Sequence, residues 1–456
     1  MRSKSLSIHV DSHGRRCELE PTTGIGRPVG ESRLDFAPHS GNMRAVNAKS
    51  TSGRAPADVI GADVLVVGGG IVGCTVACAL GLAGFSVVLA DRERWERFTD
   101  PRFDGRAFAI ALVSRRLFEG LGVWRHASRD AAAILEIRVS ERGSRQYLHY
   151  DHREVGPEPF GHMVEARTLR RALASRLAEL GGVRLLTPVS VAGLSVTDTG
   201  VEALLADGRR VRAALAVGSD GRASRTRAGA GIRVTGWDYP QTAIVCTIAH
   251  EHPHANVAHE HFLSAGPFAI LPLNGRRSAI VWTERRALAP AIMALDAGEF
   301  RDELADRIGA FLGQIEPVGP RWAYPLSLQY AETAIAPRIA LVGDALHAMH
   351  PIAGQGLNMG LRDAAALADV LVDARSLGLD IGLSTVLDRY ARWRRFDNTL
   401  MLAATDGLNR LFSNDIRPLK RLRDAGLAAV GRVPVLKRSF MRHAMGVVGD
   451  LPRLMR

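Results

Sequence analysis

The feature that most constrains this chain is a glycine-rich turn between two apolar strands, within residues 64–91. Residues 64–67 are apolar and largely β-branched, as expected of a strand buried on both faces of a sheet. Gly68, Gly70 and Gly73 follow with the spacing G-x-G-x-x-G, before an apolar helical run and a second strand over 86–90. In a dinucleotide-binding βαβ unit these glycines permit the turn, the approach of a pyrophosphate and close helix–strand packing. Asp91, directly after the second strand, stands where a carboxylate accepts hydrogen bonds from ribose hydroxyls.

A membrane-spanning helix is the alternative interpretation of this stretch. Residues 64–90 contain no charged side chain and are long enough to cross a bilayer. Six glycines and two β-branched clusters interrupt them, however, which argues against one continuous helix. Cys74 and Cys78 lie one turn apart inside the apolar run, so buried thiols are favoured over a metal or redox pair.

The net charge of +12 is concentrated at the two ends of the chain. Residues 1–57 carry +4 and residues 381–456 carry +9, which leaves the remainder near −1. We find no basic recognition module, so no nucleic-acid partner is expected. Residues 1–57 are polar and lack periodicity, which predicts a disordered basic extension. No lysine occurs between Lys49 and Lys420, which excludes mechanisms that need a lysine in the core.

Two further strands end in loops suited to a ligand. Residues 214–217 run into Asp220, and residues 339–342 run into Gly343 and Asp344. Gly354, Gln355 and Gly356 then precede a long helical pattern from Leu357, where exposed backbone can approach a planar or anionic group. Asp220 with Ser224 also fits a plain helix cap, and the second loop also fits a tight turn before a helix. With three such loops, one extended dinucleotide is the better explanation.

A strand-rich region over 239–282 contains two further features. Five histidines occur between 250 and 261, but a proline interrupts them and no strong second ligand set is present, so a solvated hairpin is favoured over a metal site. Residues 266–273, GPFAILPL, form an apolar strand in which Pro272 argues against a place in a regular central ladder.

At this point the chain resembles the FAD-dependent ubiquinone-biosynthesis hydroxylases of the 2-polyprenyl-6-methoxyphenol type, within the para-hydroxybenzoate hydroxylase fold. The resemblance rests on GGGIVG, DGRAFAIALVSRRLFEGLGVW, GSDGRASRTR, GPFAILPL and GDALHAMHPIAGQGLNMGLRDAAALAD. It implies an α/β fold in which a Rossmann-like FAD-binding domain is interleaved with a β-sheet substrate domain, followed by C-terminal helices. We expect FAD-binding parts at 58–128, 163–235 and 331–380, substrate-domain strands at 129–162 and 236–330, and a basic helical segment at 381–456.

The resemblance also implies the site. Gly68, Gly70, Gly73 and Asp91 would hold the ADP half of FAD, and Asp344, after Gly343, would meet the ribityl chain. Arg106 and Arg167 would lie near the cofactor, and Asp220 would serve both FAD and NAD(P)H. Pro351, Gly354, Gln355 and Gly356 would lie against the flavin ring, with no acid or base assigned. The substrate contacts expected from the apolar strand are Phe268, Leu271 and Pro272.

The implied reaction is hydroxylation of a prenylated phenol by O2 and NAD(P)H through a C4a-hydroperoxyflavin. A polyprenyl reductase of the same superfamily and a non-catalytic subunit of a quinone-biosynthesis complex are the alternatives. Because such a phenol is very apolar, we expect a cytoplasmic bacterial protein held peripherally at the inner membrane. The predicted contact is the segment 411–445, in which arginines and lysines alternate with apolar residues. A solvated basic face packed on the FAD domain is the alternative for that segment.

Overall fold

The computed structural model describes residues 59–100, 102, 105–141, 147–349, 354–412, 426 and 430–456. The predictions for residues 1–57, for Pro351 and for half of the arginines and lysines of the segment 411–445 lie outside the described residues. None of the helices in the described part of the chain is long and apolar enough to cross a membrane.

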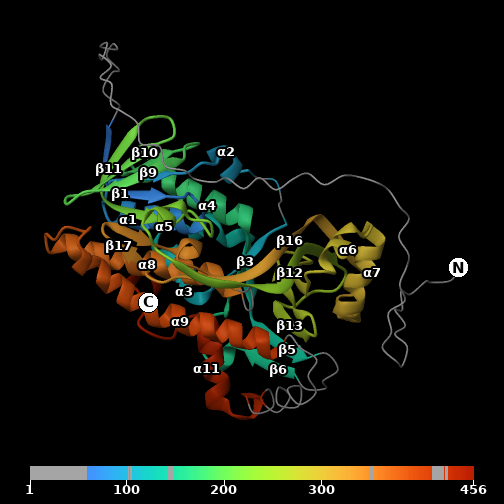
Figure 1. The fold of residues 1–456 in the computed structure, drawn as a ribbon. Helices are drawn as coiled ribbons and strands as arrows, with labels where there is room; N and C mark the ends of the chain where they lie inside the picture. The colour runs from blue at the N-terminus through green and yellow to red at the C-terminus, as the bar shows by residue number, and fades with distance from the viewer. Residues whose placement is uncertain are drawn as a thin grey trace, which may run out of the picture. The chain divides into compact units, whose positions relative to one another are not determined.

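The predicted βαβ unit is present as β1 (Val59–Val67), α1 (Ile71–Leu82) and β2 (Val87–Ala90). It lies in the middle of an eight-stranded sheet with the order β17-β18-β11-β1-β2-β8, and β10 and β9 continue it from β11 (Figure 1). The other strands of this sheet are β8 (Val183–Leu186), β9 (Val191–Val196), β10 (Val201–Leu205), β11 (Arg210–Gly218), β17 (Ile335–Ala336) and β18 (Ile339–Leu341). The central pairs β18–β11, β11–β1, β1–β2 and β2–β8 are parallel, so the carboxyl ends of these strands share one edge.

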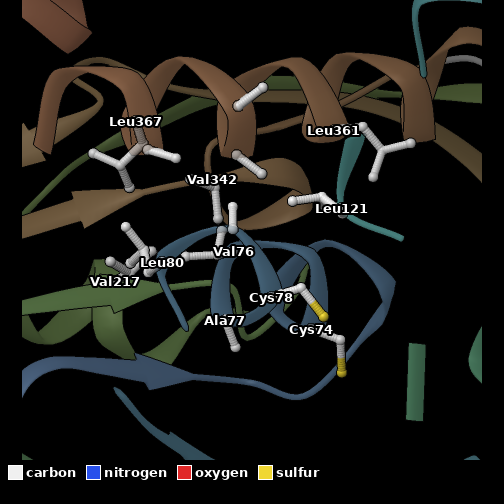
Figure 2. Packing of buried hydrophobic residues seen from close by; sticks show 14 of the residues in the cluster. Cys74, Val76, Ala77, Cys78, Leu80, Leu121, Val217, Val342, Leu361 and Leu367 are labelled. Carbon is white, nitrogen blue, oxygen red and sulfur yellow. The ribbon is translucent and has the colours of Figure 1, made fainter. Parts of the chain in front are cut away.

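Three helices pack together over this sheet: α1, α4 (Ala166–Ala178) and α8 (Gln355–Ser376). Figure 2 shows Leu361 and Leu367 of α8 above Val342, with Val76 and Leu80 of α1 below, and all of them belong to one buried cluster. Cys74 and Cys78 are buried in the same cluster as free thiols, as predicted, and burial raises the pKa of Cys78 to about 12.

The second sheet is also eight-stranded, with the order β19-β16-β12-β15-β14-β13-β5-β6. Its strands are β5 (Glu136–Glu141), β6 (Tyr147–Asp151), β12 (Val234–His250), β13 (Val257–Leu263), β14 (Gly266–Leu273), β15 (Arg277–Arg285), β16 (Ile315–Ala331) and β19 (His347–Ala348). One face of this sheet packs on α6 (Ala289–Ala294) and α7 (Ala297–Ile308), where Trp282 of β15 contacts Phe300 of α7. We call this the back face. The front face is the opposite one, where Leu271 and Val281 lie.

A third, three-stranded sheet was not predicted. It consists of β3 (Ala107–Ala111), β7 (Gly161–Glu165) and β4 (Ala132–Ile134), in the order β3-β7-β4. Both β4 and β7 contact β14 of the second sheet. Further α-helices of the described residues are α2 (Trp95–Phe98), α3 (Leu112–Gly120), α5 (Arg225–Gly229), α9 (Ser384–Phe412) and α11 (Pro434–Met445).

The strand 266–273 corrects two expectations. β14 lies between β13 and β15, so the interpretation that Pro272 keeps it out of a central ladder is wrong. The ladder with β13 ends at Ile270, and beyond it β14 pairs only with β15, so a residue without an N–H costs no bond on the β13 side. Phe268 points to the back face, toward Trp282, and therefore does not share the surface on which Leu271 lies.

Candidate active site

The fingerprint turn connects β1 to α1 with very little space around it. Gly68 has φ +104°, and a Cβ atom there would lie 2.5 Å from the carbonyl oxygen of Ser219. A Cβ on Gly73 would lie 2.0 Å from the carbonyl oxygen of Gly68, so helix and strand touch at these glycines. Gly70, in contrast, has no heavy atom within 4 Å of where its Cβ would be. The turn is thus closed on the protein side and open in front of Gly70.

Asp91 lies at the end of β2, beside this turn. Its Oδ2 accepts a hydrogen bond of 2.5 Å from the backbone N–H of Gly69, and its Oδ1 accepts one of 2.7 Å from that of Glu93. The carboxylate therefore fixes the fingerprint loop and stands at the edge where the parallel strands end.

Asp220 follows β11 and reaches the start of α5. Its carboxylate accepts hydrogen bonds from the Ser224 hydroxyl at 2.5 Å and from the backbone N–H of Thr226 at 3.0 Å. The helix-cap alternative thus describes its contacts within the chain. Arg227, which is buried, donates to the carbonyl oxygens of Arg222 and Ala345 at 2.9 Å each, and so ties this loop to the one that follows β18.

The third loop begins at Gly343, which has φ +59°. Gly343, Ala345 and Leu346 are buried, whereas the Asp344 side chain is exposed and accepts no hydrogen bond from any residue that the structure describes. A Cβ on Gly360 of α8 would lie 2.8 Å from Val72 of α1 and 3.0 Å from the Cα of Gly343. The two helices and the loop therefore meet through glycine contacts, and Asp344 is directed away from them.

Both helices begin at a glycine without a side-chain cap. Gly70 precedes α1, and Gly354, with φ +61°, precedes α8. Their first N–H groups and the positive ends of their dipoles can therefore interact with a ligand. Gln355 and Gly356 form the first turn of α8, and a Cβ on Gly356 would lie 3.8 Å from Met349.

Asn358 fixes the start of α8 on the third sheet. Its amide donates to the carbonyl oxygen of Ala109 at 2.9 Å, and its side-chain oxygen accepts from the backbone N–H of Ala111 at 2.9 Å. These contacts position Gly354, whose missing side chain leaves room for Ala109.

A buried ionic network lies behind the loop of Gly343. Asp363 accepts hydrogen bonds from the backbone N–H of Gly343 at 3.1 Å and from Nε of Arg394 at 2.8 Å, and its Oδ2 lies 2.7 Å from Nε2 of His347. Burial acts to raise the pKa of Asp363, but His347 and Arg394 hold it below its usual value. Arg394 also donates to Asp397 and Asn398, so the loop is connected to α9.

Arg106 precedes β3 and Arg167 follows β7, and these two strand ends are paired in the third sheet. The carbonyl oxygen of Arg106 accepts a hydrogen bond from the N–H of Ala166 at 2.9 Å, so both arginines stand at the start of α4. The buried carboxylate of Glu165 accepts from Nε of Arg167 at 2.7 Å and from Arg277 of β15 at 2.8 Å. Glu165 thus joins α4 to the second sheet.

The front face of the second sheet faces the segment around Gly354 that precedes α8. Ala243 and Val281 pack in one cluster with Met349 and Met359, which flank the loop before and after Gly354. Leu271 packs in another cluster, with Leu112 and Met163 of α3 and β7. An apolar sheet surface therefore stands opposite the start of α8.

No group of three or more His, Cys, Asp or Glu that could hold a metal occurs among the described residues, which include all five histidines between 250 and 261. His250 and His254 bond to backbone carbonyl oxygens of His252 and Leu273. The expectation of a solvated hairpin is wrong, because β15 and β14 lie between β12 and β13 in the sheet, and His259 and His261 belong to β13.

The comparisons with known proteins agree with this geometry. A family model described as an FAD binding domain matches residues 61–396. The "Ubiquinone hydroxylase UbiL" of Rhodospirillum rubrum is 52% identical over 398 residues, which cover 87% of this chain and 92% of the relative. The chain belongs to the FAD-dependent ubiquinone-biosynthesis hydroxylase family. The hydroxylase is also 34% identical to the "3-demethoxyubiquinol 3-hydroxylase" of Escherichia coli, over 84% of this chain and 98% of that relative.

Solved structures agree on the fold of the hydroxylase. PqsL of P. aeruginosa, solved with 2-aminobenzoylacetate, aligns with a TM-score of 0.67 and 25% identity over 81% of this chain and all of that chain. The p-nitrophenol 4-monooxygenase PnpA of Pseudomonas putida aligns with a TM-score of 0.69 at 21% identity, over 85% of this chain and 98% of that chain. The hydroxylase is therefore an FAD-dependent monooxygenase with the predicted mixed α/β fold.

Several residues that shape the site of the hydroxylase were not predicted. Asn358, Arg227, Asp363 and the pair Glu165–Arg277 all act through contacts between segments far apart in the sequence. Asn358 and Asp363 stood inside the matched glycine-rich motif, three and eight residues after Gln355, and that position was the available signal. Nothing in the sequence marked Glu165 and Arg277 as partners.

Proposed function

We propose that this FAD-dependent monooxygenase hydroxylates the aromatic ring of a prenylated phenol in ubiquinone biosynthesis. The observation that carries the proposal is Asp344, an exposed carboxylate that makes no hydrogen bond or ion pair with a described residue, on an otherwise buried loop between two uncapped helix starts. A carboxylate that is directed away from the protein at a strand end suits the hydroxyl groups of a ribityl chain.

FAD fits the residues that are present. Gly68 and Gly73 allow the turn, and the open space at Gly70 with the start of α1 suits the pyrophosphate. Asp91 would hold the ribose of the adenosine, Asp344 the ribityl chain, and Gly354 to Gly356 with Pro351 would lie near the ring. Arg106, Arg167 and Asp220 would complete the surroundings of the cofactor. Bound FAD would supply the electron transfer from NAD(P)H and the activation of O2.

The polypeptide contributes binding, orientation and the exclusion of water. In the overall reaction one oxygen atom of O2 enters a ring C–H bond, the other leaves as water, and NAD(P)H supplies two electrons. The apolar front face, with Leu271 at one edge and Val281 nearer the start of α8, would cover the substrate ring. Pro272 alternates with Leu271 along β14 and therefore points to the back face with Phe268, away from this surface.

The substrate is too apolar to diffuse freely in water, so we propose that α9 and α11 contact an anionic membrane surface. Phe396 of α9 and Val435 of α11 are 71% and 73% exposed, and Phe440 is exposed as well. Exposed arginines stand between them, among them Arg438 and Arg442. Apolar side chains interleaved with cationic ones are typical of interfacial helices. A quinone-biosynthesis complex would be an alternative source of substrate.

The test is hydroxylation under 18O2. Purified protein reconstituted with FAD is supplied with NAD(P)H and a phenol that carries a short prenyl chain, and the product is analysed by mass spectrometry. One 18O atom in the ring is expected. A product with saturated double bonds and no added oxygen would identify a polyprenyl reductase instead, and protein that takes up no FAD would identify a non-catalytic subunit.

A further inference from the structure

The front face of the second sheet carries one cross-strand row with a single acidic member, Glu260 of β13. The side chains that share the row are all apolar, and strand pairing places them side by side. They are Leu148 of β6, Val139 of β5, Ala269 of β14, Val281 of β15, Val245 of β12 and Trp322 of β16.

The same row leads to the start of α8. Val281 packs with Met349 and Met359, on either side of Gly354. Glu260 lies two strands farther along the row, which is about 10 Å at the usual spacing of strands. One aromatic ring would bridge that separation between Glu260 and the loop proposed to meet the flavin. Two residues along β13, Phe262 stacks on Phe412 of α9 at 4.1 Å between ring centroids, so this end of the row is closed by aromatic side chains.

Glu260 has no hydrogen bond or ion pair with any described residue, although its side chain is half-buried. Burial alone raises its pKa to about 7. Among the described residues, the titratable groups nearest to Glu260 on the front face are Glu141 of β5 and Tyr150 of β6. The neighbouring strand β14 carries no titratable group. On α9, Asp406 is already bonded to Tyr239 and Arg410. An acid without a partner destabilises a fold, and such groups occur where a ligand supplies the missing donor.

We propose that Glu260 binds the phenolic hydroxyl group of the substrate, as the carboxylate that accepts its O–H hydrogen bond. This rests on the function proposed above and adds a residue that touches the reacting ring. As oxygen adds to the ring carbon, the O–H proton passes to Glu260 and the phenol oxygen becomes a carbonyl. When the ring regains aromaticity, the carbon releases its proton to water and Glu260 returns the proton it holds to the phenol oxygen, so the carboxylate ends unchanged. An acid with a pKa near that of the medium suits both transfers.

The experiment compares two ligands that differ only in whether they carry the phenolic O–H hydrogen-bond donor. FAD-loaded full-length wild type, Glu260→Gln and the control Glu316→Gln are titrated with 2-prenylphenol and with its methyl ether, and the dissociation constants are measured by calorimetry. Glu316 lies on β16 of the same sheet with its side chain 65% exposed, so the control makes the same chemical change away from the row. Wild type and control should bind the phenol about ten- to a hundredfold more tightly than the ether, as expected for a hydrogen bond to a charged acceptor. Glu260→Gln should lose this preference and keep its affinity for the ether.

The pH profile gives a second readout. In wild type, kcat/KM for the phenol should fall as the pH drops below about 7, where Glu260 becomes protonated, and Glu260→Gln should lack this limb. If wild type hydroxylates the phenol and Glu260→Gln shows the same preference and the same limb, the inference is wrong and the proposed function stands. If wild type neither binds nor hydroxylates the phenol, both are wrong.

Thermal unfolding separates this role from a structural one. A glutamate in the unfolded chain ionises near pH 4 to about 4.5, whereas burial raises the pKa of folded Glu260 to about 7. The free energy of unfolding of wild type therefore falls as the pH rises from the first value to the second, and stays constant above it. The Tm of Glu260→Gln should therefore exceed that of wild type by an amount that grows up to pH about 7. A lower Tm for the variant across this range would show that Glu260 stabilises the fold and would overturn the inference.

Discussion

At the scale of single residues, replacing each of two glycines of the fingerprint by alanine should affect the stability of the fold differently. Gly68→Ala should lower the free energy of unfolding of the FAD-free protein by about 1–3 kcal/mol, since it combines a positive φ with a backbone oxygen 2.5 Å from the new Cβ. Gly70→Ala should leave it within about 0.5 kcal/mol, because φ is −67° and the space is open. Both should weaken FAD binding. Denaturant unfolding and flavin titration would measure this, and equal stabilities for the two variants would contradict it.

Asp344→Ala should weaken FAD binding by about 1–3 kcal/mol, because it removes a charged hydrogen-bond acceptor that has no described partner within the chain. The fold itself should be unaffected for the same reason. Flavin titration of the FAD-free protein tests this, with Asp302→Ala, whose side chain is 73% exposed on α7, as the control. An Asp344→Ala protein with unchanged flavin affinity would remove Asp344 from the site.

Residues that act locally could be read from the sequence, and residues that act across the fold could not. The sequence suggested a helix cap formed by Asp220 with Ser224 because the two residues lie four positions apart, and the structure contains that contact. Asn358 bonds to Ala109 and Asp363 to Arg394, and such partners become neighbours only after the chain has folded.

At the scale of elements, periodicity predicted that β1, α1 and α8 exist, because each has an uninterrupted pattern. Their starts were less certain: β1 begins at Val59, five residues before the expected strand, and α8 begins at Gln355, two residues before Leu357. It did not predict the three-stranded sheet, whose strands are short and come from three separate segments. Residues 266–273 show a second limit of prediction from periodicity. Because both faces of this strand are apolar, the sequence did not indicate that Phe268 lies on the back face and Leu271 on the front face.

The contact between α8 and α9 makes a prediction at this scale. Asp363→Asn should lower the free energy of unfolding by about 3–5 kcal/mol, since it removes the fully buried carboxylate that pairs with Arg394 and leaves this arginine with the partly exposed Asp397. Because the pKa of Asp363 is lowered in the fold, its contribution is present above about pH 4 and is lost as the pH falls through the folded pKa. Denaturant unfolding at pH 7 and in acid tests this against Asp302→Asn, and a loss as small as that control's would contradict it.

At the scale of the whole molecule, the reductant should bind only transiently. The sequence contains one G-x-G-x-x-G between a strand and a helix, so NAD(P)H would cross the surface of the FAD-binding sheet instead of occupying a domain of its own. Calorimetry of the FAD-loaded protein should give no stoichiometric complex of micromolar affinity or tighter. Such a complex would require a second nucleotide site.

The exposed residues of α11 predict salt-sensitive binding to membranes. Co-sedimentation with anionic liposomes should be strong at low salt and weak at about 1 M, where the Debye length is about 3 Å. Val435→Ser with Phe440→Ser should reduce it several-fold. Leu377→Ser, which changes an equally exposed side chain after α8, should not. Equal binding by both variants would exclude α11 as the contact.

The order of strands in the first sheet has a consequence for how the protein is made. Val64 pairs with Leu215, and Ala216 pairs with Ile339, so the middle of this sheet joins segments from the first and last parts of the described chain. Pairings between such distant segments form slowly. On the ribosome, β1 can pair with β2 early but must wait for β11 on its other side, and the loop of Asp344 with α8 emerges later still. A nascent chain that stops before residue 340 has the complete glycine fingerprint and only part of the surface that FAD requires. Flavin capture should therefore come at the end of synthesis, and unpaired strand edges remain exposed until then.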